Sequence, residues 1–279
     1  MTGASLAIDV SKVHGGRQFS QADSVAVEEP LEIQLCSASA ADSAAKSVSI
    51  TMRTPGDDAE LAVGFLFTEA IITSASQIAS VQHSGDPAPA GFRNVIRVEL
   101  EAGVQVDFGR LERHFYTTSS CGVCGKSSLD ALRVSGQQPL SDVTTRFSRE
   151  ALVRLPDELR KEQEVFSKTG GLHAAAVFSP DGEITLVRED VGRHNAVDKV
   201  VGALLMANRL PAHGFGLLVS GRASFELMQK ALVAGLPLLA AVGAPSSLAV
   251  SLAKEFDMTL IGFLRQGNFN IYSGAERLA

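Results

Sequence analysis

Short apolar runs alternate with amphipathic stretches over the C-terminal third of the chain, and this pattern constrains the fold more than any other feature of the sequence. Apolar runs at 216–219, 238–242 and 259–263 have the composition of buried strands. Between them, apolar residues recur at helical spacing. Continuous apolar strands separated by such helices are typical of a parallel sheet covered on both faces. We therefore expect an α/β C-terminal region.

The first half of the sequence is instead rich in predicted strands. Alternating apolar and polar residues at 25–27, 31–35 and 48–52 predict half-buried strands. Residues 95–100 and 104–108 predict a hairpin around a short glycine-containing turn. The whole chain is thus expected to be α+β, with a β-rich N-terminal region before the α/β part.

Helix signals and one linker divide the chain further. A helix is predicted from Asp58, with Asp57 or Asp58 as its cap, and another over part of 148–168 that ends at Gly170. The glycine, glutamines and proline at 135–143 are typical of a linker. We expect four segments: a flexible N-terminus at 1–24, a β-rich region at 25–134, a linker at 135–147 and a C-terminal domain at 148–279.

The charge balance and the absence of long apolar segments exclude several functional classes. The chain has 31 acidic and 25 basic side chains, so its formal net charge is −6, and a general nucleic-acid binder would carry a basic face. Its most apolar segment, 234–244, is too short to span a bilayer, and no secretory signal is recognisable. Three cysteines do not make a disulfide framework in 279 residues. We expect a cytoplasmic protein that binds neither nucleic acid nor membrane.

The turns after the predicted parallel strands are candidate ligand sites. They are Ser220–Arg222, 243–247 and 264–268, and two of them lead into helix N-termini, whose free N–H groups favour anions. Ligands of open α/β sheets gather beyond the carboxyl ends of the strands. Small residues together with Arg222 and Arg265 suit an anionic, nucleotide-like ligand. On these residues alone, the alternative that they only form tight turns carries equal weight.

A cysteine pair is the main candidate for chemistry. Cys121 and Cys124 lie among small residues ahead of a predicted helix at 127–134. Amide donors at a helix start, with Lys126 nearby, would stabilise a thiolate, and the flanking glycines leave the sulfurs accessible. A mobile, accessible thiolate suits attack on a sulfur donor and delivery of sulfur to an acceptor.

Four other interpretations of the cysteine pair fit the sequence less well. A structural zinc site needs four ligands, and Cys36 and the histidines are scattered along the sequence. A zinc nucleobase deaminase needs a general-base Glu and a Pro before its first cysteine; here Ser120 replaces the Pro, and the related segment 173–175 lacks the Glu. A thioredoxin-like centre would follow the first strand of a βαβ unit, whereas this cysteine pair follows a predicted hairpin and a polar stretch. A buried packing pair is disfavoured by the polar flanks.

The motifs that surround the cysteines resemble one known family when taken together. They are Cys121-Gly-Val-Cys124-Gly125, Glu189 to Lys199, Ser220 to Glu226, Ala234 to Pro237, Ala244 to Val250 and Gly262 to Arg265. The combination closely resembles the FdhD family of formate dehydrogenase accessory sulfurtransferases, from about Val25 to the C-terminus.

The resemblance implies an enzyme of the sulfurtransferase class. Such proteins accept sulfane sulfur from a cysteine desulfurase as a persulfide on a CxxC cysteine. They pass the sulfur to the molybdenum (or tungsten) bis-guanine-dinucleotide cofactor that the catalytic subunit of formate dehydrogenase receives. The resemblance also implies a homodimer, and a C-terminal fold similar to cytidine deaminase without its zinc chemistry, so that no catalytic metal is expected.

The resemblance also implies site residues. By position Cys121 carries the persulfide, and Cys124 assists transfer or resolves the persulfide. The cofactor-binding residues are expected to be Arg193, His194, Ser220, Arg222, Phe263, Leu264, Arg265, Gln266, Gly267 and Asn268. From the residues alone, Arg193 and His194 could equally cap and pack. His173 and Cys36 are interpreted as packing residues.

Two other functions compete with sulfur transfer. A cofactor-binding chaperone would escort the molybdenum cofactor without covalent sulfur transfer, and the cysteines would only shape its surface. A metal-dependent hydrolase of the deaminase type is disfavoured by the missing general-base Glu.

Overall fold

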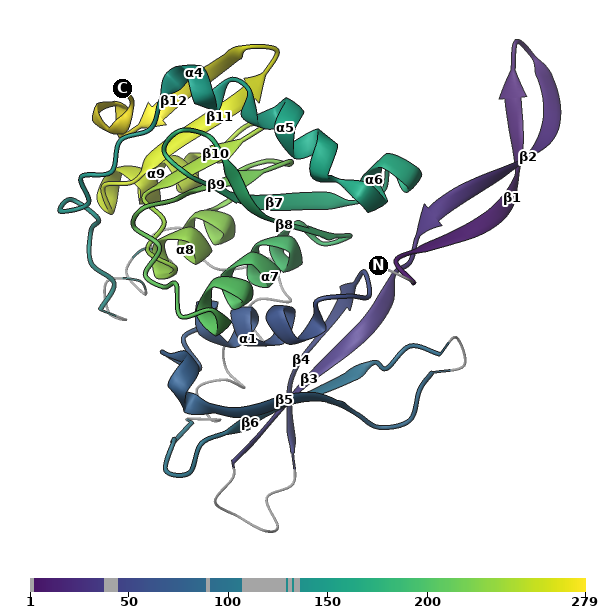
Figure 1. The fold of residues 1–279 in the computed structure, drawn as a ribbon, viewed down its shortest axis with the longest axis horizontal. Coiled ribbons are helices and arrows are strands. Elements are labelled where there is room, and N and C mark those ends of the chain that lie inside the picture. The colour runs from purple at the N-terminus through teal and green to yellow at the C-terminus, as the bar shows by residue number, and fades with distance from the viewer. Residues whose placement is uncertain (1–2, 38–44, 89–90, 107–128, 130–131, 133–135) are drawn as a thin grey trace.

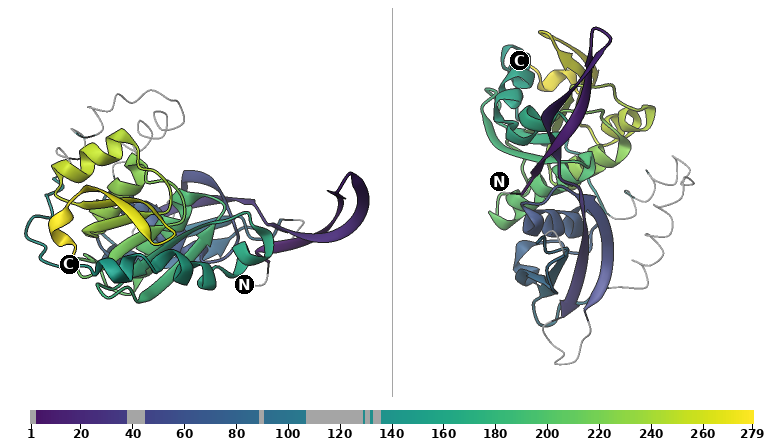
Figure 2. Two further views of the ribbon diagram at one scale, coloured as in Figure 1. Left: turned by 90° about the horizontal axis from the view of Figure 1, so that it is seen from above. Right: turned by 90° about the vertical axis from the view of Figure 1, so that its right-hand side faces the viewer.

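The computed structural model describes residues 3–37, 45–88, 91–106, 129, 132 and 136–279. Two lobes and a projecting β-ribbon make up the molecule (Figure 1). Figure 2 shows that the ribbon extends away from both lobes, with the N-terminus at its base and the C-terminus on the C-terminal lobe.

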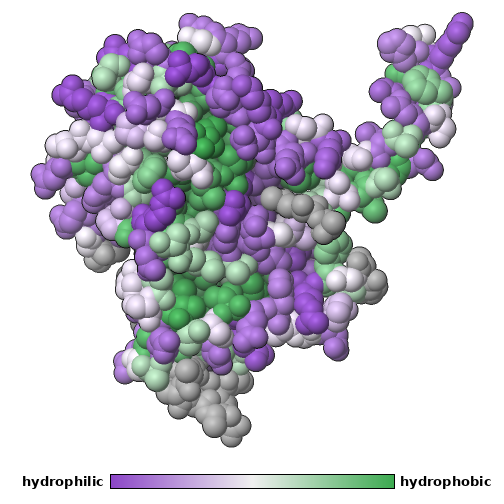
Figure 3. Space-filling view, viewed as in Figure 1, coloured by the Kyte–Doolittle hydropathy of each residue, from purple (hydrophilic) through white to green (hydrophobic). Residues whose placement is uncertain are grey.

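The ribbon pairs β1 (Ser5–His14) with β2 (Arg17–Ala26) in antiparallel register. Gly15 and Gly16 join them at φ values of 56° and 77°, which a tight hairpin turn with two positive φ angles requires. The sequence patterns predict only a flexible N-terminus at 1–24, because the two strands mix polar and apolar residues. Apolar side chains on the ribbon are exposed, Leu6 by 57%, and they give the green patches along it in Figure 3.

The N-terminal lobe is a four-stranded sheet in the order β4-β3-β6-β5, with one helix on one face. Its elements are β3 (Glu29–Ser37), β4 (Lys46–Arg53), α1 (Asp58–Thr68), η1 (Ala75–Gln77), β5 (Ile78–Ser84) and β6 (Val95–Leu100). The predicted hairpin of 95–100 with 104–108 is wrong. Strand β6 pairs with β3 on one edge and β5 on the other, so it has no free edge for a further partner.

The start of α1 differs from the predicted cap. Asp57 occupies the N-cap position in a left-handed conformation, and its side chain makes no capping hydrogen bond. The Asp58 carboxylate instead accepts two hydrogen bonds from the guanidinium of buried Arg53, at 3.0 and 2.9 Å. This bidentate pair connects the end of β4 to the first turn of the helix.

The C-terminal lobe contains a six-stranded sheet in the order β12-β11-β10-β9-β7-β8. Its strands are β7 (His173–Phe178), β8 (Ile184–Asp190), β9 (Gly216–Val219), β10 (Leu238–Ala241), β11 (Thr259–Arg265) and β12 (Asn268–Ser273). Strands β9, β10 and β11 are parallel, whereas β7, β8 and β12 run antiparallel to their neighbours. The sheet is therefore mixed, because the β7–β8 and β11–β12 hairpins add antiparallel strands to a parallel centre.

Helices cover both faces of this sheet, as the alternating pattern predicts. One face packs against α7 (Arg193–Met206), α8 (Phe225–Val233) and α9 (Ser247–Glu255). The other packs against α4 (Arg149–Leu152) and α5 (Leu155–Glu162), while α6 (Glu164–Thr169) lies beside the ribbon's base, and η2 (Ala275–Arg277) precedes the C-terminus. The mixed α/β architecture with a β-rich N-terminal region is confirmed. In the described ranges, no helix has the length and apolarity to cross a membrane.

The two lobes meet where α1 crosses α7, and the crossing depends on two glycines. A Cβ atom at Gly64 would lie 1.8 Å from the carbonyl oxygen of Asp198. A Cβ atom at Gly202 would lie 1.9 Å from the carbonyl oxygen of Glu60. Only glycine at both positions permits this close approach of the two helix backbones.

A buried ion pair adjoins the crossing. Lys230 of α8 lies 2.8 Å from a carboxylate oxygen of Asp198, and both side chains are buried. The Thr68 hydroxyl donates to Asp198 (2.8 Å) and accepts from Lys230 Nζ (2.9 Å). Burial alone would lower the pKa of Lys230, but the carboxylates of Asp198 and Glu69 raise it above its ordinary value. The charged network therefore connects α1, α7 and α8.

Candidate functional site

The turns that follow β9, β10 and β11 form one continuous row. The amide of Phe263 donates to the carbonyl oxygen of Gly243 (3.0 Å), and the amide of Gly243 donates to that of Gly221 (2.9 Å). A methyl group on Gly243 would lie 2.9 Å from the Gly221 oxygen and 3.1 Å from Arg222 Cγ, so glycine allows the two turns to touch. The three turns singled out from the sequence thus share the carboxyl edge of the sheet.

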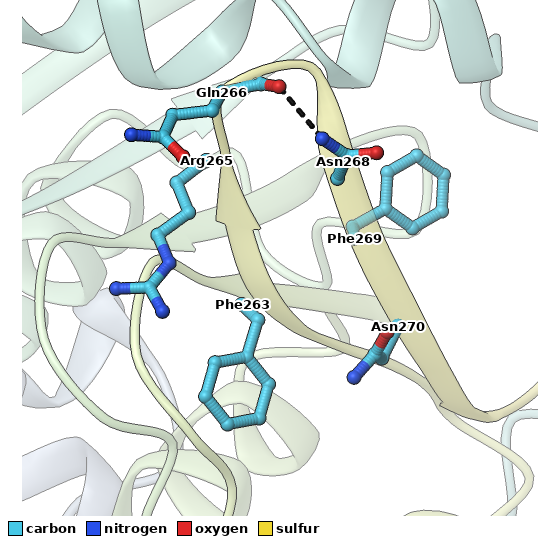
Figure 4. Close-up of a pocket in the computed structure, with 6 residues that line it drawn as sticks. All are labelled: Phe263, Arg265, Gln266, Asn268, Phe269 and Asn270. Carbon is cyan, nitrogen blue, oxygen red and sulfur yellow. Dashed lines mark hydrogen bonds between the residues drawn. The ribbon is translucent and has the colours of Figure 1, made fainter.

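A cavity of about 300 Å³ lies at the β11–β12 hairpin. Its lining residues are Phe263, Arg265, Gln266, Asn268, Phe269 and Asn270 (Figure 4). The Arg265 side chain is exposed, and its guanidinium carbon lies 5.7 Å from the centre of the Phe263 ring. Figure 4 shows the side chains of Phe263 and Arg265 on one side of the hairpin. The cavity offers a cation, amide groups and aromatic rings.

Four of the six residues predicted at 263–268 line this cavity, and two do not. Leu264 is fully buried in the core, and Gly267 occupies the turn at a φ of 73°. Sequence reasoning missed Phe269 and Asn270, because strand β12 was not recognised. The available signal was the short polar stretch around Gly267 that follows the apolar run, and Gln266 and Gly267 form the hairpin turn at positive φ.

Arg193 and His194 lie on the first turn of α7, next to the N-terminus of α8. Their Nε and Nε2 atoms, and the Oγ atom of Ser224, are buried and lack a hydrogen-bond partner within the described part of the chain. Buried polar atoms are normally paired, so the Arg193 Nε–H is suited to donate to an acceptor atom of a ligand, whereas the Glu226 carboxylate lies beside His194 and Ser224. Ser224, the N-cap of α8, was not among the predicted ligand residues.

The electrostatics of this corner combine a carboxylate with positive and neutral groups. The His194 imidazole, with Nε2 3.9 Å from a Glu226 carboxylate oxygen, is the main cause that lowers the pKa of Glu226 to about 2. Burial, followed by the positive charges of Arg193 and His194, lowers the pKa of His173 below its ordinary value. His173 is therefore a neutral imidazole at neutral pH.

Ser220 is partly buried and Arg222 is exposed, although they belong to the same turn. The Ser220 hydroxyl oxygen accepts from the amide of Ala174 (2.8 Å), which connects β9 to β7. Arg222 is exposed at the same turn. The predicted ligand residues thus lie along one edge in two groups, at the β11–β12 hairpin and around the starts of α7 and α8.

The remaining polar residues of the Glu189–Lys199 motif are structural. The buried Asp190 carboxylate accepts from the amides of Thr54 (3.2 Å) and Gly192 (2.8 Å) and from the Asn195 side chain (3.0 Å). It also forms an ion pair with buried Lys199 at 2.8 Å. Gly192 is the N-cap of α7, and Asp190 connects the two lobes.

Comparison with known proteins identifies the family. Residues 26–279 match the model of the FdhD/NarQ family. The chain belongs to the FdhD/NarQ family.

Relatives within this family extend over nearly the whole chain. A sulfur carrier protein FdhD from Streptomyces coelicolor is 50% identical over 273 residues, which is 97% of this chain and 94% of the relative. The protein of the same name from Mycobacterium tuberculosis is 48% identical over 266 residues, covering 93% of each chain. That from Saccharolobus solfataricus is 41% identical over 270 residues, covering 97% of this chain and 96% of the relative.

A solved structure shares the FdhD/NarQ fold of this chain. It comes from Desulfotalea psychrophila, and its protein is described as a formate dehydrogenase accessory protein. It is 24% identical in sequence, superposes with a TM-score of 0.73, and the match covers 99% of this chain and 100% of the other. The likeness confirms the fold.

The cysteines that the FdhD resemblance singles out, Cys121 and Cys124, lie outside the described residues, as does Lys126. Cys36, on β3, is partly buried, and its Sγ lies 3.8 Å from the Val98 carbonyl oxygen. Burial raises the pKa of the Cys36 thiol, which makes it a weak nucleophile at neutral pH. Among the residues that the structure describes, no group of three or more His, Cys, Asp or Glu side chains could hold a metal.

Proposed function

We propose that this chain is a sulfurtransferase that carries sulfur as a persulfide on Cys121. Its sulfur donor is a cysteine desulfurase. Its acceptor is the molybdenum (or tungsten) bis-guanine-dinucleotide cofactor, which is its substrate and which passes to the catalytic subunit of formate dehydrogenase. The protein acts in the cytoplasm as a homodimer.

Family membership is the observation that carries this proposal. Relatives named as sulfur carrier proteins align over more than nine-tenths of the chain, and the Cys121–Cys124 pair provides the thiols that such a carrier needs. The sheet edge with its unpartnered donors supports the other half of the proposal, because a dinucleotide substrate carries anionic oxygens that need such donors.

The sulfur chemistry has two balanced steps. The Cys121 thiolate attacks the terminal sulfur of the donor persulfide, so that the donor's S–S bond breaks and the donor cysteine leaves as a thiolate. The Cys124 thiolate then attacks the inner sulfur of the Cys121 persulfide. The terminal sulfur leaves as sulfide, two thiols are oxidised to a Cys121–Cys124 disulfide, and the sulfane sulfur is reduced. A cellular dithiol restores the pair.

Intact-mass analysis tests the carrier step. The protein is incubated with a cysteine desulfurase and free cysteine, and wild type is compared with Cys121→Ala. We expect an adduct of one or more sulfur atoms that a reductant removes and that Cys121→Ala lacks. Absence of the adduct from folded wild-type protein, with an active desulfurase, contradicts the proposal. A Cys124→Ala variant that still activates formate dehydrogenase normally would show that Cys124 is not needed.

We expect the anionic groups of the cofactor to bind the cationic side chains along the sheet edge. Arg265, exposed in the hairpin cavity, is expected to contact a pyrophosphate or a guanine edge. Arg265→Ala should weaken GDP binding about tenfold, the effect of losing one charge-assisted contact. Arg146→Ala, an exposed arginine outside the predicted site, is the matched control. Equal affinity of Arg265→Ala and wild type would contradict the assignment.

A cofactor-binding chaperone is the second candidate, because unpartnered donors suit cofactor binding whether or not sulfur is transferred. The two functions differ in their dependence on Cys121. A chaperone in which Cys121 is replaced by Ala should still activate formate dehydrogenase, whereas a sulfurtransferase should not.

A further inference from the structure

The β1–β2 ribbon gathers its apolar side chains on one of its two faces. Residues opposite each other in an antiparallel pair share a face, and side chains alternate between the faces along each strand. The register assigns every second residue of β1, with its partner on β2, to the same face. The apolar face of the ribbon consists of Leu6, Ile8, Val10, Phe19 and Val25, with Gln21 and Asp23 among them and Lys12, His14 and Arg17 at the tip. Small or polar residues make up the opposite face, except for Val13.

The apolar face is left uncovered by the described part of the chain. Leu6 is 57% exposed and Phe19 is 45% exposed. The ribbon packs mainly against α6, at its base, and extends from there away from both lobes (Figure 2). A two-stranded ribbon is at best marginally stable in water on its own. Burial of this face against another surface would supply the stabilisation that the ribbon lacks.

Strand β4 carries a second uncovered apolar surface. It is an edge strand of the N-terminal sheet, and its Ile50 and Met52 side chains are 69% and 46% exposed. Their partners on β3 alternate with the residues of that strand that pack against α1, so both side chains face away from the helix. Of the large apolar side chains exposed in the described ranges, all but Met206 and Ile271 lie on the ribbon or on β4. An exposed apolar edge strand is a template for association with another chain.

The two apolar surfaces match in charge and in size. Residues 10–22, around the tip of the ribbon, include Lys12 and Arg17 and no acidic residue. The chain next to β4 instead carries Glu28 and Glu32. Strand rise and strand spacing give the apolar face of the ribbon a length of about 33 Å and a width of about 10 Å. Two such faces, each covered by a β4 surface, would bury about 1,300 Å² in total, which is the area of a standard protein–protein interface.

We propose that the apolar face of the ribbon packs on the Ile50–Met52 surface of β4 in a second copy of this chain, and that the second copy's ribbon packs on β4 of the first. A twofold axis produces both contacts at once, because each copy supplies both surfaces. The ribbon points away from its own lobes, so it reaches the β4 strand of a second copy rather than its own (Figure 1). The inference rests on the proposed function, since it takes the homodimer from there and assigns the dimer an interface.

Sedimentation equilibrium of the full-length protein over a range of concentrations tests this interface. Ile8→Ser on the ribbon and Ile50→Ser on β4 should each weaken self-association at least about tenfold, because each removes an apolar anchor from the contact. Val13→Ser is the matched control, since Val13 is 67% exposed on the opposite face of the same ribbon, and its dimer should dissociate as the wild-type dimer does. Circular dichroism should show the same fold in all variants, because the replaced side chains are exposed. Equal dimer affinities of Ile8→Ser and Val13→Ser, or a wild-type protein that stays monomeric, overturn the inference.

Photocrosslinking identifies what covers the ribbon without removing the contact. A Phe19→benzoylphenylalanine variant places the crosslinker on the apolar face, and light and isotopically heavy copies are mixed in dilute solution and then concentrated. Mass spectrometry should find peptides that join position 19 of a light copy to the 46–53 segment of a heavy copy, and the reverse. Crosslinks confined to single copies would show that the ribbon folds back on its own chain, and crosslinks between copies that avoid β3 and β4 would place it elsewhere. Either result overturns the inference.

Failure of this inference is separable from failure of the proposed function. Persulfide loading of wild-type Cys121 is measured by intact mass, which is independent of the self-association measurement. Loading of Cys121, with no effect of Ile8→Ser or Ile50→Ser on the dimer, would remove this interface and leave the carrier. A dimer that depends on Ile8 and Ile50, in a protein whose Cys121 takes up no sulfur, would leave the interface and remove the carrier.

Discussion

Two groups of polar side chains in the Glu189–Lys199 motif have opposite environments. Asp190 and Lys199 are buried, paired with each other at 2.8 Å, and supplied with further hydrogen bonds from both lobes. Arg193, one turn away, keeps a buried Nε atom that no described residue pairs. Residues only a few positions apart on one helix start thus serve two purposes. The satisfied group connects the lobes, and the unsatisfied group is available to a ligand.

The largest expected effect comes from breaking the satisfied group. Asp190→Ala leaves the Lys199 ammonium buried without a counter-charge, which should lower the free energy of unfolding by about 3–5 kcal/mol. Urea denaturation followed by circular dichroism measures it. Glu162→Ala, an exposed carboxylate on α5, should change stability by less than about 0.5 kcal/mol. Equal stabilities of the two variants would show that the buried pair contributes nothing.

The glycine crossing should come next in size. Gly202→Ala places a methyl group 1.9 Å from the Glu60 carbonyl oxygen, so α1 and α7 must separate. We expect a loss of about 3 kcal/mol, at the upper end of ordinary overpacking. Gly214→Ala has no atom within 4 Å of the new methyl group and is the control. A Gly202→Ala protein with the wild-type melting temperature would mean that the lobes do not depend on this contact.

Replacing Arg193 should weaken ligand binding and leave the stability of the protein nearly unchanged. Arg193→Ala removes a buried nitrogen without a described partner, so stability should change by less than about 0.5 kcal/mol. GDP affinity should fall about tenfold, since a cation facing the ligand is lost. Thermal unfolding and calorimetric titration give the two numbers, with Arg17→Ala on the ribbon as control. A loss of stability as large as that of Asp190→Ala would assign Arg193 to packing instead.

The smallest expected effect is the pH dependence that comes from His173, which lies between the two groups. Its titration midpoint, followed by NMR, should lie below the ordinary value of about 6.5, because burial and positive neighbours disfavour the imidazolium. Protonation then favours the unfolded chain, so His173 contributes a loss of stability as the pH falls through about 6.5. Arg193→Ala removes one positive neighbour and should move the midpoint upward. A midpoint above 6.5 in wild type contradicts this account.

The C-terminal sheet was predictable because its signals are local. Apolar runs and helical spacing located β9, β10 and β11 and the helices between them, α8 and α9. Strands β1, β2, β5 and β12 were missed, since their polar and apolar residues alternate irregularly on exposed or edge positions. Pattern reasoning depends on a strand having one clearly buried face.

The sequence did not predict which residues of the Glu189–Lys199 motif pair with other parts of the protein and which stay unpaired. Asp190 accepts a hydrogen bond from Thr54, and Asp198 accepts one from Thr68, and both partners lie more than a hundred positions earlier in the chain. Spacing within the motif carries no information about such partners. Sequence patterns did indicate the three turns at the sheet edge, because glycine and serine after a buried strand have a local cause. The role of Ser224 and the uncovered apolar face of the ribbon appear only once the surrounding elements are placed.

The contact between Gly64 and Gly202 limits how the family can recombine. A chimera that takes α1 from one parent and α7 from another must inherit glycine at both positions and the same separation of the helix axes. Inserting one residue in α1 before Gly64 would rotate that position by about 100° and present a side chain to α7. We therefore expect the two lobes to be exchangeable only as one unit, although each has its own sheet. Crossovers that keep α1 and α7 together should give folded hybrids far more often than those that separate them.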